Sequence, residues 1–258
     1  CSRLNEQRLC TIRRSAAFWA TANACHGLDC WQEGSAWGDV RVKRQETFGS
    51  TLPRLHVVTD DKVLARPDWQ SVAVRVCEAG GPALALHVRG PRTCGREIYR
   101  LTAALAPHAK RTHALLFVND RVDVALINDV DGVHLGVRSL ALLTARNLLG
   151  SEVWIGASCH DATGAAAAAA AGADYMFLGA IFETPSHPND RGIGIDGLVE
   201  VTGGRSGPVM GIGGIDPRRA RSIVDAGAFG AAALRGVWDA EDPANAVREY
   251  LAIMTNGR

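Results

Sequence analysis

The chain has almost no excess charge and no long apolar run, and each absence excludes a class of function. Its 28 Lys and Arg residues balance 27 Asp and Glu residues, so the formal net charge is +1. The basic residues are scattered, whereas a nucleic-acid binder normally gathers them in a patch or stripe. No apolar run approaches the roughly 18 residues that a membrane-spanning helix needs. We therefore expect neither a nucleic-acid partner nor a membrane partner.

Cysteine is scarce over most of the chain. Of the seven cysteines, only Cys77, Cys94 and Cys159 lie beyond residue 30. Three widely spaced cysteines are too few for the disulfide framework of a small secreted protein. We therefore expect a cytoplasmic protein that acts on small molecules.

Residues 1–50 differ from the rest because they show no sustained helical or strand period. The stretch RRSAAFWATANAC (13–25) superficially resembles an export signal, but its apolar run is short and broken. Cys25, His26 and Cys30 lie close together, without a standard zinc spacing or a matching second pair. We favour a third interpretation, a disordered N-terminal extension over residues 1–50, with the natural start near Thr51 or Leu52.

From residue 51 to residue 258 the sequence is regular. Short apolar runs end in polar residues or glycine, and helical sequence follows nearly all of them. The expected strands are 55–60, 83–90, 114–120, 132–136, 154–158, 175–180, 209–215 and 230–236. Their continuous apolar character indicates a parallel sheet covered by helices on both faces. Eight such units in roughly 200 residues predict an α/β protein, a single (β/α)8 TIM barrel.

The ligand site of such a barrel lies at the carboxyl ends of its strands. Arg89 ends a buried strand, where a guanidinium needs an anionic partner such as a substrate phosphate. GIGGID (211–216) and ALRG (233–236) predict a phosphate site, because glycine lets backbone N–H groups approach an anion. Alternatively, these glycines only turn the chain. His87 and His134 are also consistent with a structural role, satisfied by hydrogen bonds inside the barrel.

Several motifs occur in an order and at a spacing that resemble a known family, thiamine phosphate synthase and its relative, the TenI thiazole tautomerase. They are VVTD (57–60), HVRG (87–90), VNDRVDVAL (118–126), DGVHLG (131–136), IGASCHD (155–161), DYMFLGAIFETPS (174–186), MGIGGI (210–215) and AAALRGV (231–237). The resemblance covers almost all of residues 55–254. The resemblance implies a barrel that binds hydroxyethylthiazole phosphate, with the phosphate at Gly213, Gly214 and the loop after the eighth strand.

The synthase of this family joins that thiazole to an aminopyrimidine pyrophosphate and releases pyrophosphate with the help of Mg²⁺. The resemblance implies Asn119 as a pyrophosphate contact and Asp120 as one Mg²⁺ ligand. Where the family has a second metal-binding carboxylate, this chain has Ser139, and a hydroxyl is a poor substitute on a hard dication. Two family lysines are replaced by Pro91 and His187.

These replacements favour the TenI tautomerase, which keeps the thiazole phosphate pocket and needs no metal cofactor. Its general acid/base histidine is Ala180 here, so His187 becomes the candidate for proton transfer, with Arg89 as the second catalytic residue. An equal alternative is that His187 is a solvated loop residue with no part in catalysis. The main prediction is a metal-free thiazole tautomerase. The alternatives are a synthase that uses Mg²⁺ through Asp120, and a non-catalytic binder of thiazole or thiamine phosphate.

The residues expected to bind the substrate and its phosphate are Asn119, Ser158, Thr184, Gly213, Gly214, Arg235 and Gly236. The expected partners are the phosphorylated thiazole and, for the synthase, the aminopyrimidine pyrophosphate. A homo-oligomer is left open.

Overall fold

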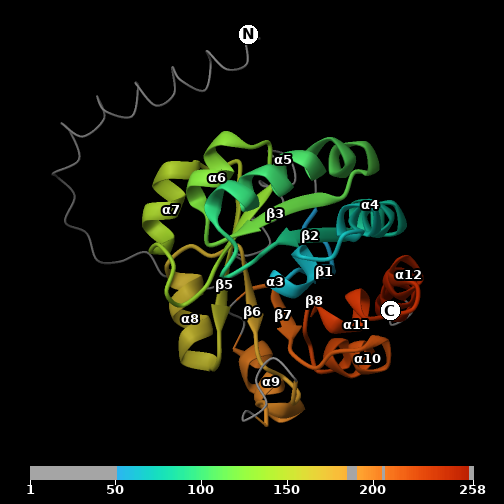
Figure 1. Ribbon diagram of the computed structural model, residues 1–258. Helices are drawn as coiled ribbons and strands as arrows, with labels where there is room; N and C mark the ends of the chain where they lie inside the picture. Colours follow the sequence, from blue (N-terminus) through green and yellow to red (C-terminus); the bar gives the residue numbers. More distant parts are fainter. Residues whose placement is uncertain (1–50, 185–190, 205–206, 256–258) are drawn as a thin grey trace, which may run out of the picture. The chain divides into compact units, whose positions relative to one another are not determined.

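Eight parallel strands close into a barrel, and helices surround it (Figure 1). The computed structural model describes residues 51–184, 191–204 and 207–255. The strands pair in chain order from β1 to β8, and β8 pairs with β1 to close the ring. The predicted (β/α)8 barrel is therefore confirmed. The expected extension, residues 1–50, lies outside the described residues.

Each predicted strand is present, and most end earlier than predicted. The strands are β1 (Leu55–Val58), β2 (Leu84–Val88), β3 (Leu115–Asn119), β4 (Gly132–Leu135), β5 (Trp154–Cys159), β6 (Tyr175–Leu178), β7 (Val209–Ile212) and β8 (Gly230–Ala233). The polar and glycine residues at the ends of the predicted runs leave the ladder and enter the loops, because they belong to the rim of the barrel. Only β5 continues beyond its predicted end.

The helices between and after the strands vary in length. They are α3 (Asp61–Leu64), α4 (Trp69–Gly80), the 3₁₀ helix η2 (Gly81–Ala83), α5 (Gly95–Thr112), α6 (Val122–Ile127), α7 (Leu142–Leu149), α8 (Ala162–Ala170), α9 (Gly194–Gly203), α10 (Pro217–Asp225), α11 (Arg235–Trp238) and α12 (Pro243–Thr255). Several begin at an aspartate that caps the first turn. Asp216, for example, accepts a hydrogen bond from the backbone N–H of Arg219 at 2.8 Å.

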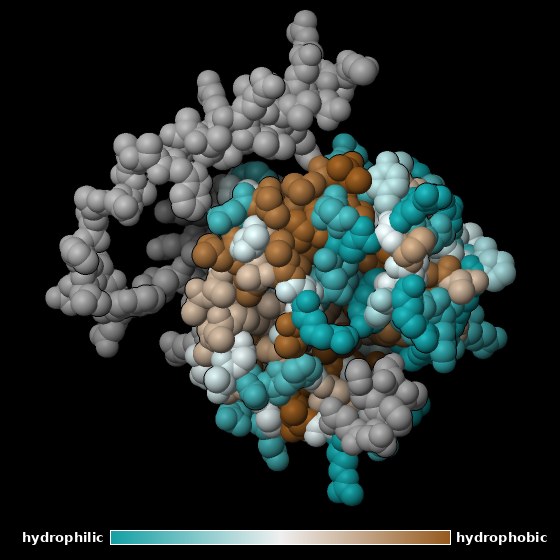
Figure 2. All heavy atoms as spheres, turned by 60° about the vertical axis from the view of Figure 1, so that its left-hand side comes forward, coloured by the Kyte–Doolittle hydropathy of each residue, from teal (hydrophilic) through white to brown (hydrophobic). Residues whose placement is uncertain are grey.

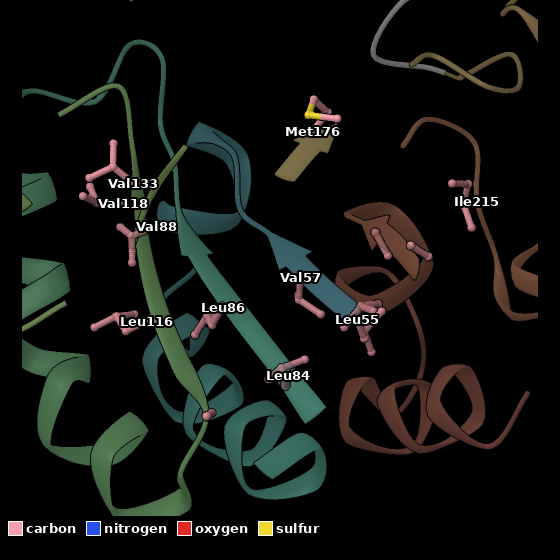
Figure 3. Close-up of a cluster of buried hydrophobic side chains, with 14 of the residues drawn as sticks. Leu55, Val57, Leu84, Leu86, Val88, Leu116, Val118, Val133, Met176 and Ile215 are labelled. Carbon is pink, nitrogen blue, oxygen red and sulfur yellow. The ribbon is translucent and has the colours of Figure 1, made fainter. Parts of the chain in front are cut away.

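Side chains alternate between two apolar layers along the strands, as the period of a strand requires. On β1, Leu55 and Val57 belong to the layer between the barrel and its helices, whereas Val58 belongs to the layer inside the barrel. Figure 3 shows the outer layer, to which β1, β2, β3 and β4 all contribute. Both layers are apolar, which explains the continuous apolar runs of the sequence.

Large rings fill the barrel interior. They are His56, His87, Phe117, His134, Tyr175 and Phe177, all buried and with ring centroids about 4 to 6 Å from their neighbours. Two glycines make room for them. A Cβ on Gly132 would lie 2.1 Å from the ring of Phe117, and a Cβ on Gly156 would lie 2.1 Å from the ring of Tyr175.

Exposed apolar side chains gather around α6, α7 and the loop before α7 (Figure 2). They are Leu126, Ile127, Val137, Leu140, Leu143 and Leu148. None of the helices in the described part of the chain combines the length and the apolar character that a bilayer crossing demands.

Substituting Gly132 by alanine is expected to destabilise the protein, because the new methyl group meets the ring of Phe117 inside the barrel. Overpacking of this kind costs about 1–3 kcal/mol, measured as a lower free energy of unfolding in denaturant. Gly203→Ala is the control, because a Cβ there meets no atom within 4 Å. A Gly132→Ala protein as stable as the Gly203→Ala protein would contradict this account of the interior.

Candidate active site

A cavity of about 580 Å³ opens at the carboxyl ends of the strands. Its size is that of a small-molecule site. The sequence-predicted residues that line it are Arg89, Asn119, Ser158, Thr184, Gly213, Gly214, Arg235 and Gly236. The structure thus brings together residues from strand ends far apart in the sequence. Asp120 is not part of this lining, and His187 lies outside the described residues.

The glycine pair after β7 is held against the loop after β6. Gly213 and Gly214 have φ values of 97° and 63°, which an L side chain rarely adopts. The N–H of Phe182 donates to the carbonyl of Gly213 at 3.1 Å, and a Cβ on Gly214 would lie 2.6 Å from the carbonyl oxygen of Glu183. Both the backbone angles and the close approach therefore require glycine here.

Arg89 directly follows β2, and its backbone is held by Thr59. The N–H of Arg89 donates to the hydroxyl oxygen of Thr59 at 2.8 Å, and that hydroxyl donates to the carbonyl of Arg89 at 2.9 Å. Within the described residues its guanidinium has no hydrogen bond or ion pair. A partly buried cation that lines a cavity without a protein anion is a strong candidate for an anionic ligand.

Two further arginines reach the cavity near β7 and β8. Arg235, a predicted phosphate ligand, donates to Asp60 Oδ2 at 2.6 Å and so already has an anionic partner. Arg219 was not predicted. It donates to the carbonyl of Gly214 at 2.7 Å and lies 4.8 Å above the ring of Phe182. Its signal in the sequence is its place in the first turn of the helix that follows the glycine pair.

Asp120, the candidate metal ligand, is hydrogen-bonded to Ser139, which stands in place of the second carboxylate. Asp120 Oδ1 accepts hydrogen bonds from the Ser139 hydroxyl and from the N–H of Gly136, the latter at 2.9 Å. Among the residues that the structure describes, no group of three or more His, Cys, Asp or Glu side chains could hold a metal ion. Mg²⁺ commonly binds through one or two carboxylates together with substrate phosphates. Asp120 therefore fits an ion that arrives with a pyrophosphate, rather than a preformed metal cage.

The barrel histidines support the cavity lining from below. His134 Nε2 lies 2.9 Å from Ser158 Oγ, and His87 Nδ1 lies 3.0 Å from Asn119 Oδ1. Burial lowers the pKa of His87 to about 3 and holds the pKa of His134 well below its usual value. Both are therefore neutral, and the interpretation that they are satisfied by hydrogen bonds inside the barrel is confirmed.

His160 also lines the cavity, although the sequence did not single it out. Its Nδ1 lies 2.6 Å from the carbonyl oxygen of Gly179. A carbonyl can only accept, so Nδ1 donates this hydrogen bond. The neighbouring Ala180 also lines the cavity and has no group that could transfer a proton.

Comparison with known proteins places this geometry in a family. Residues 55–237 match the family model described as thiamine monophosphate synthase. The chain is 47% identical over 152 residues to the thiamine biosynthesis bifunctional protein ThiM/ThiE of Symbiobacterium thermophilum, a match that covers 58% of this chain and 32% of that protein. It is 34% identical over 201 residues to the thiamine-phosphate synthase of Pyrococcus furiosus, covering 78% of this chain and 94% of that protein.

The chain spans about a third of the bifunctional relative and nearly all of the second relative. A solved structure, thiamine phosphate pyrophosphorylase from Pyrococcus furiosus, superposes with a TM-score of 0.69 at 32% identity and covers 83% of this chain and 98% of its own. Because the family match runs through every strand from β1 to β8, the chain belongs to the thiamine monophosphate synthase family.

Proposed function

We propose that the protein is a thiamine phosphate synthase, a transferase that joins hydroxyethylthiazole phosphate to an aminopyrimidine pyrophosphate and releases pyrophosphate. The observation that carries the proposal is that one cavity offers two separate places for anions, one beside β7 and one at the end of β2. A synthase has to hold two separate anionic substrates, the thiazole phosphate and the pyrophosphate, and these would occupy both places. Relatives matched over nearly their whole length are named thiamine-phosphate synthase, which also favours this alternative over the predicted tautomerase.

The place beside β7 suits the thiazole phosphate. Gly213 and Gly214 line the cavity and have no side chain that would keep an anion away from the backbone. Arg219 adds a positive charge, held in place by the carbonyl of Gly214 and the ring of Phe182. Arg235 contributes less charge, because Asp60 neutralises it.

The place at the end of β2 suits the pyrophosphate. The guanidinium of Arg89 can donate two parallel hydrogen bonds to phosphate oxygens. When Mg²⁺ is bound, it neutralises charge on the leaving pyrophosphate, and Asp120 would be its protein ligand. Arg89 would stabilise the same charge as it develops, while a bond forms between the thiazole nitrogen and the pyrimidine methylene carbon. Buried Phe177 and Val58 line the cavity and would keep water from that carbon.

The test of the proposal is formation of thiamine phosphate from both substrates with Mg²⁺, together with an equal amount of pyrophosphate. A parallel sample contains only the thiazole carboxylate phosphate in D₂O, and NMR follows its ring protons. Exchange of the thiazole ring protons without formation of thiamine phosphate would favour the tautomerase over the synthase. Calorimetric binding of the thiazole phosphate without either reaction would leave a non-catalytic binder.

Arg89→Met is expected to weaken binding of the pyrophosphate substrate by about 10- to 100-fold, because a charged hydrogen bond contributes roughly 1.5–3 kcal/mol. Binding of the thiazole phosphate should not change. Arg92→Met is the matched control, since Arg92 is highly exposed and pairs with Asp61 at 3.4 Å. Calorimetry with inorganic pyrophosphate measures the effect. Equal affinities in the Arg89→Met and Arg92→Met proteins would exclude Arg89 as the pyrophosphate ligand.

Ser139→Asp is expected to restore a second carboxylate beside Asp120 and to lower the Mg²⁺ concentration needed for half-maximal activity by about tenfold. Without Mg²⁺ the two carboxylates repel each other, so the melting temperature should fall and then recover when Mg²⁺ is added. Ser139→Ala is the control and should show no Mg²⁺-dependent recovery. No gain in Mg²⁺ affinity would show that the serine is not the reason for a weak metal site.

A further inference from the structure

One carboxylate in the lining of the cavity has no partner in the described part of the chain. Glu183 lines the cavity and is exposed. Its carboxylate has no hydrogen bond or ion pair with any other described residue, whereas Asp60 and Asp61, at the same end of the barrel, are paired with arginines. A charge that no protein group neutralises acts with its full strength on a ligand in the cavity.

The backbone determines where Glu183 stands. In the loop after β6, the N–H of Ile181 donates to the carbonyl of Ile212 at 2.8 Å, so this loop is bound to the end of β7. Two residues further on, the carbonyl oxygen of Glu183 lies so near to Gly214 that a Cβ there would be only 2.6 Å away. Glu183 is thus held beside the glycine pair, at the place proposed for the thiazole phosphate.

Asp216 is the other carboxylate among the described residues of the lining, and it already has a structural role. Its Oδ1 accepts the hydrogen bond from the N–H of Arg219 that caps α10. Burial and, after it, the charge of Asp216 raise the pKa of the Tyr250 hydroxyl, which is buried on α12. The carboxylate of Asp216 therefore serves the start of a helix, and that of Glu183 is left for a ligand.

The proposed reaction creates a positive charge in this cavity. A bond forms between the thiazole ring nitrogen and the pyrimidine methylene carbon, while the bond from that carbon to the pyrophosphate oxygen breaks and its electron pair leaves with the pyrophosphate. No proton moves, so the thiazole ring is neutral in the substrate and cationic in the product. Arg89 and Arg219 line the same cavity and oppose this charge, so an anion close to the ring lowers the barrier.

We propose that Glu183 is a catalytic residue whose carboxylate stabilises the positive charge that develops on the thiazole ring. The proposal rests on the proposed function, in which the ring becomes cationic. The phosphate beside β7 ties the thiazole to the glycine pair, and a two-carbon arm separates that phosphate from the ring. The side chain of Glu183 starts beside the same pair and has a similar reach. Because its carboxylate repels the phosphate, it meets the ring instead.

The charge interaction is tested by calorimetry with two ligands that differ at the ring nitrogen. One is hydroxyethylthiazole phosphate, and the other is its N-methyl derivative, a thiazolium that carries the positive charge of the product. The protein should prefer the cation. Glu183→Gln keeps the shape of the side chain and removes its charge, so it should reduce this preference about tenfold. The affinity for the neutral ligand should stay the same or rise, because a negative charge near its phosphate is gone.

Three further variants separate Glu183 from other sources of negative charge. Glu200→Gln is the matched control, since Glu200 is exposed on α9 and does not line the cavity, and it should keep the full preference for the cation. Asp216→Asn should keep it too, because asparagine also caps a helix. Glu183→Asp retains the charge and should keep more of the preference than Glu183→Gln. A preference that survives in Glu183→Gln, or that is lost in Asp216→Asn instead, would overturn the proposal.

The catalytic step is tested by single-turnover formation of thiamine phosphate from both substrates with Mg²⁺. Glu183→Gln should lower the rate about tenfold without weakening the binding of the thiazole phosphate, because the ring is neutral until the new bond forms. If Glu183→Gln formed thiamine phosphate at the rate of the unsubstituted protein, the role of Glu183 would fail and the proposed function would stand. If the unsubstituted protein formed no thiamine phosphate, both would fail.

Discussion

The packing of Phe117 over Gly132 and of Tyr175 over Gly156 decides what the barrel interior can hold. A closed parallel barrel has no aqueous pore, so its inner side chains must fill the space to the density of a core. With glycine at two inner positions, large rings from neighbouring strands can share one layer. Three members of that layer are histidines, which pack like phenyl rings and also form hydrogen bonds. The floor of the cavity is therefore apolar in bulk and yet carries defined polar groups.

The polar groups at the rim fall into two kinds, those that the protein already satisfies and those that it leaves for a ligand. Asp60 and Arg235 neutralise each other, and the Ser139 hydroxyl donates to Asp120. By contrast, the guanidinium of Arg89 has no hydrogen bond or ion pair among the described residues. An unpaired cation that lines a cavity has the greatest need of an anion, so charge alone ranks Arg89 above Arg235 as a ligand contact. Sequence position could not make this distinction, because Arg235 and its partner Asp60 are far apart in the chain.

The sequence was informative wherever one local pattern determines one structure. Each of the eight strands is a buried run, and burial on both faces follows from its composition, so the barrel was predictable. The ends of the strands were less so, since an apolar run does not show where the ladder stops. Arg219 and His160 were missed because their roles depend on Phe182 and Gly179, which belong to the loop after another strand. The contact between His56 and His87 depends on the register of β1 and β2, which neither strand reveals by itself.

Imidazole explains why the interior layer uses histidine where a phenyl ring would also fit. A phenyl ring only fills the volume, whereas a neutral imidazole of similar shape also donates a hydrogen bond at one nitrogen and accepts one at the other. His56 contacts the carbonyl of Pro53 at one nitrogen and His87 at the other, and His87 in turn contacts Asn119 Oδ1. Histidine therefore lets one layer pack as densely as an apolar core and still form hydrogen bonds up to the lining of the cavity.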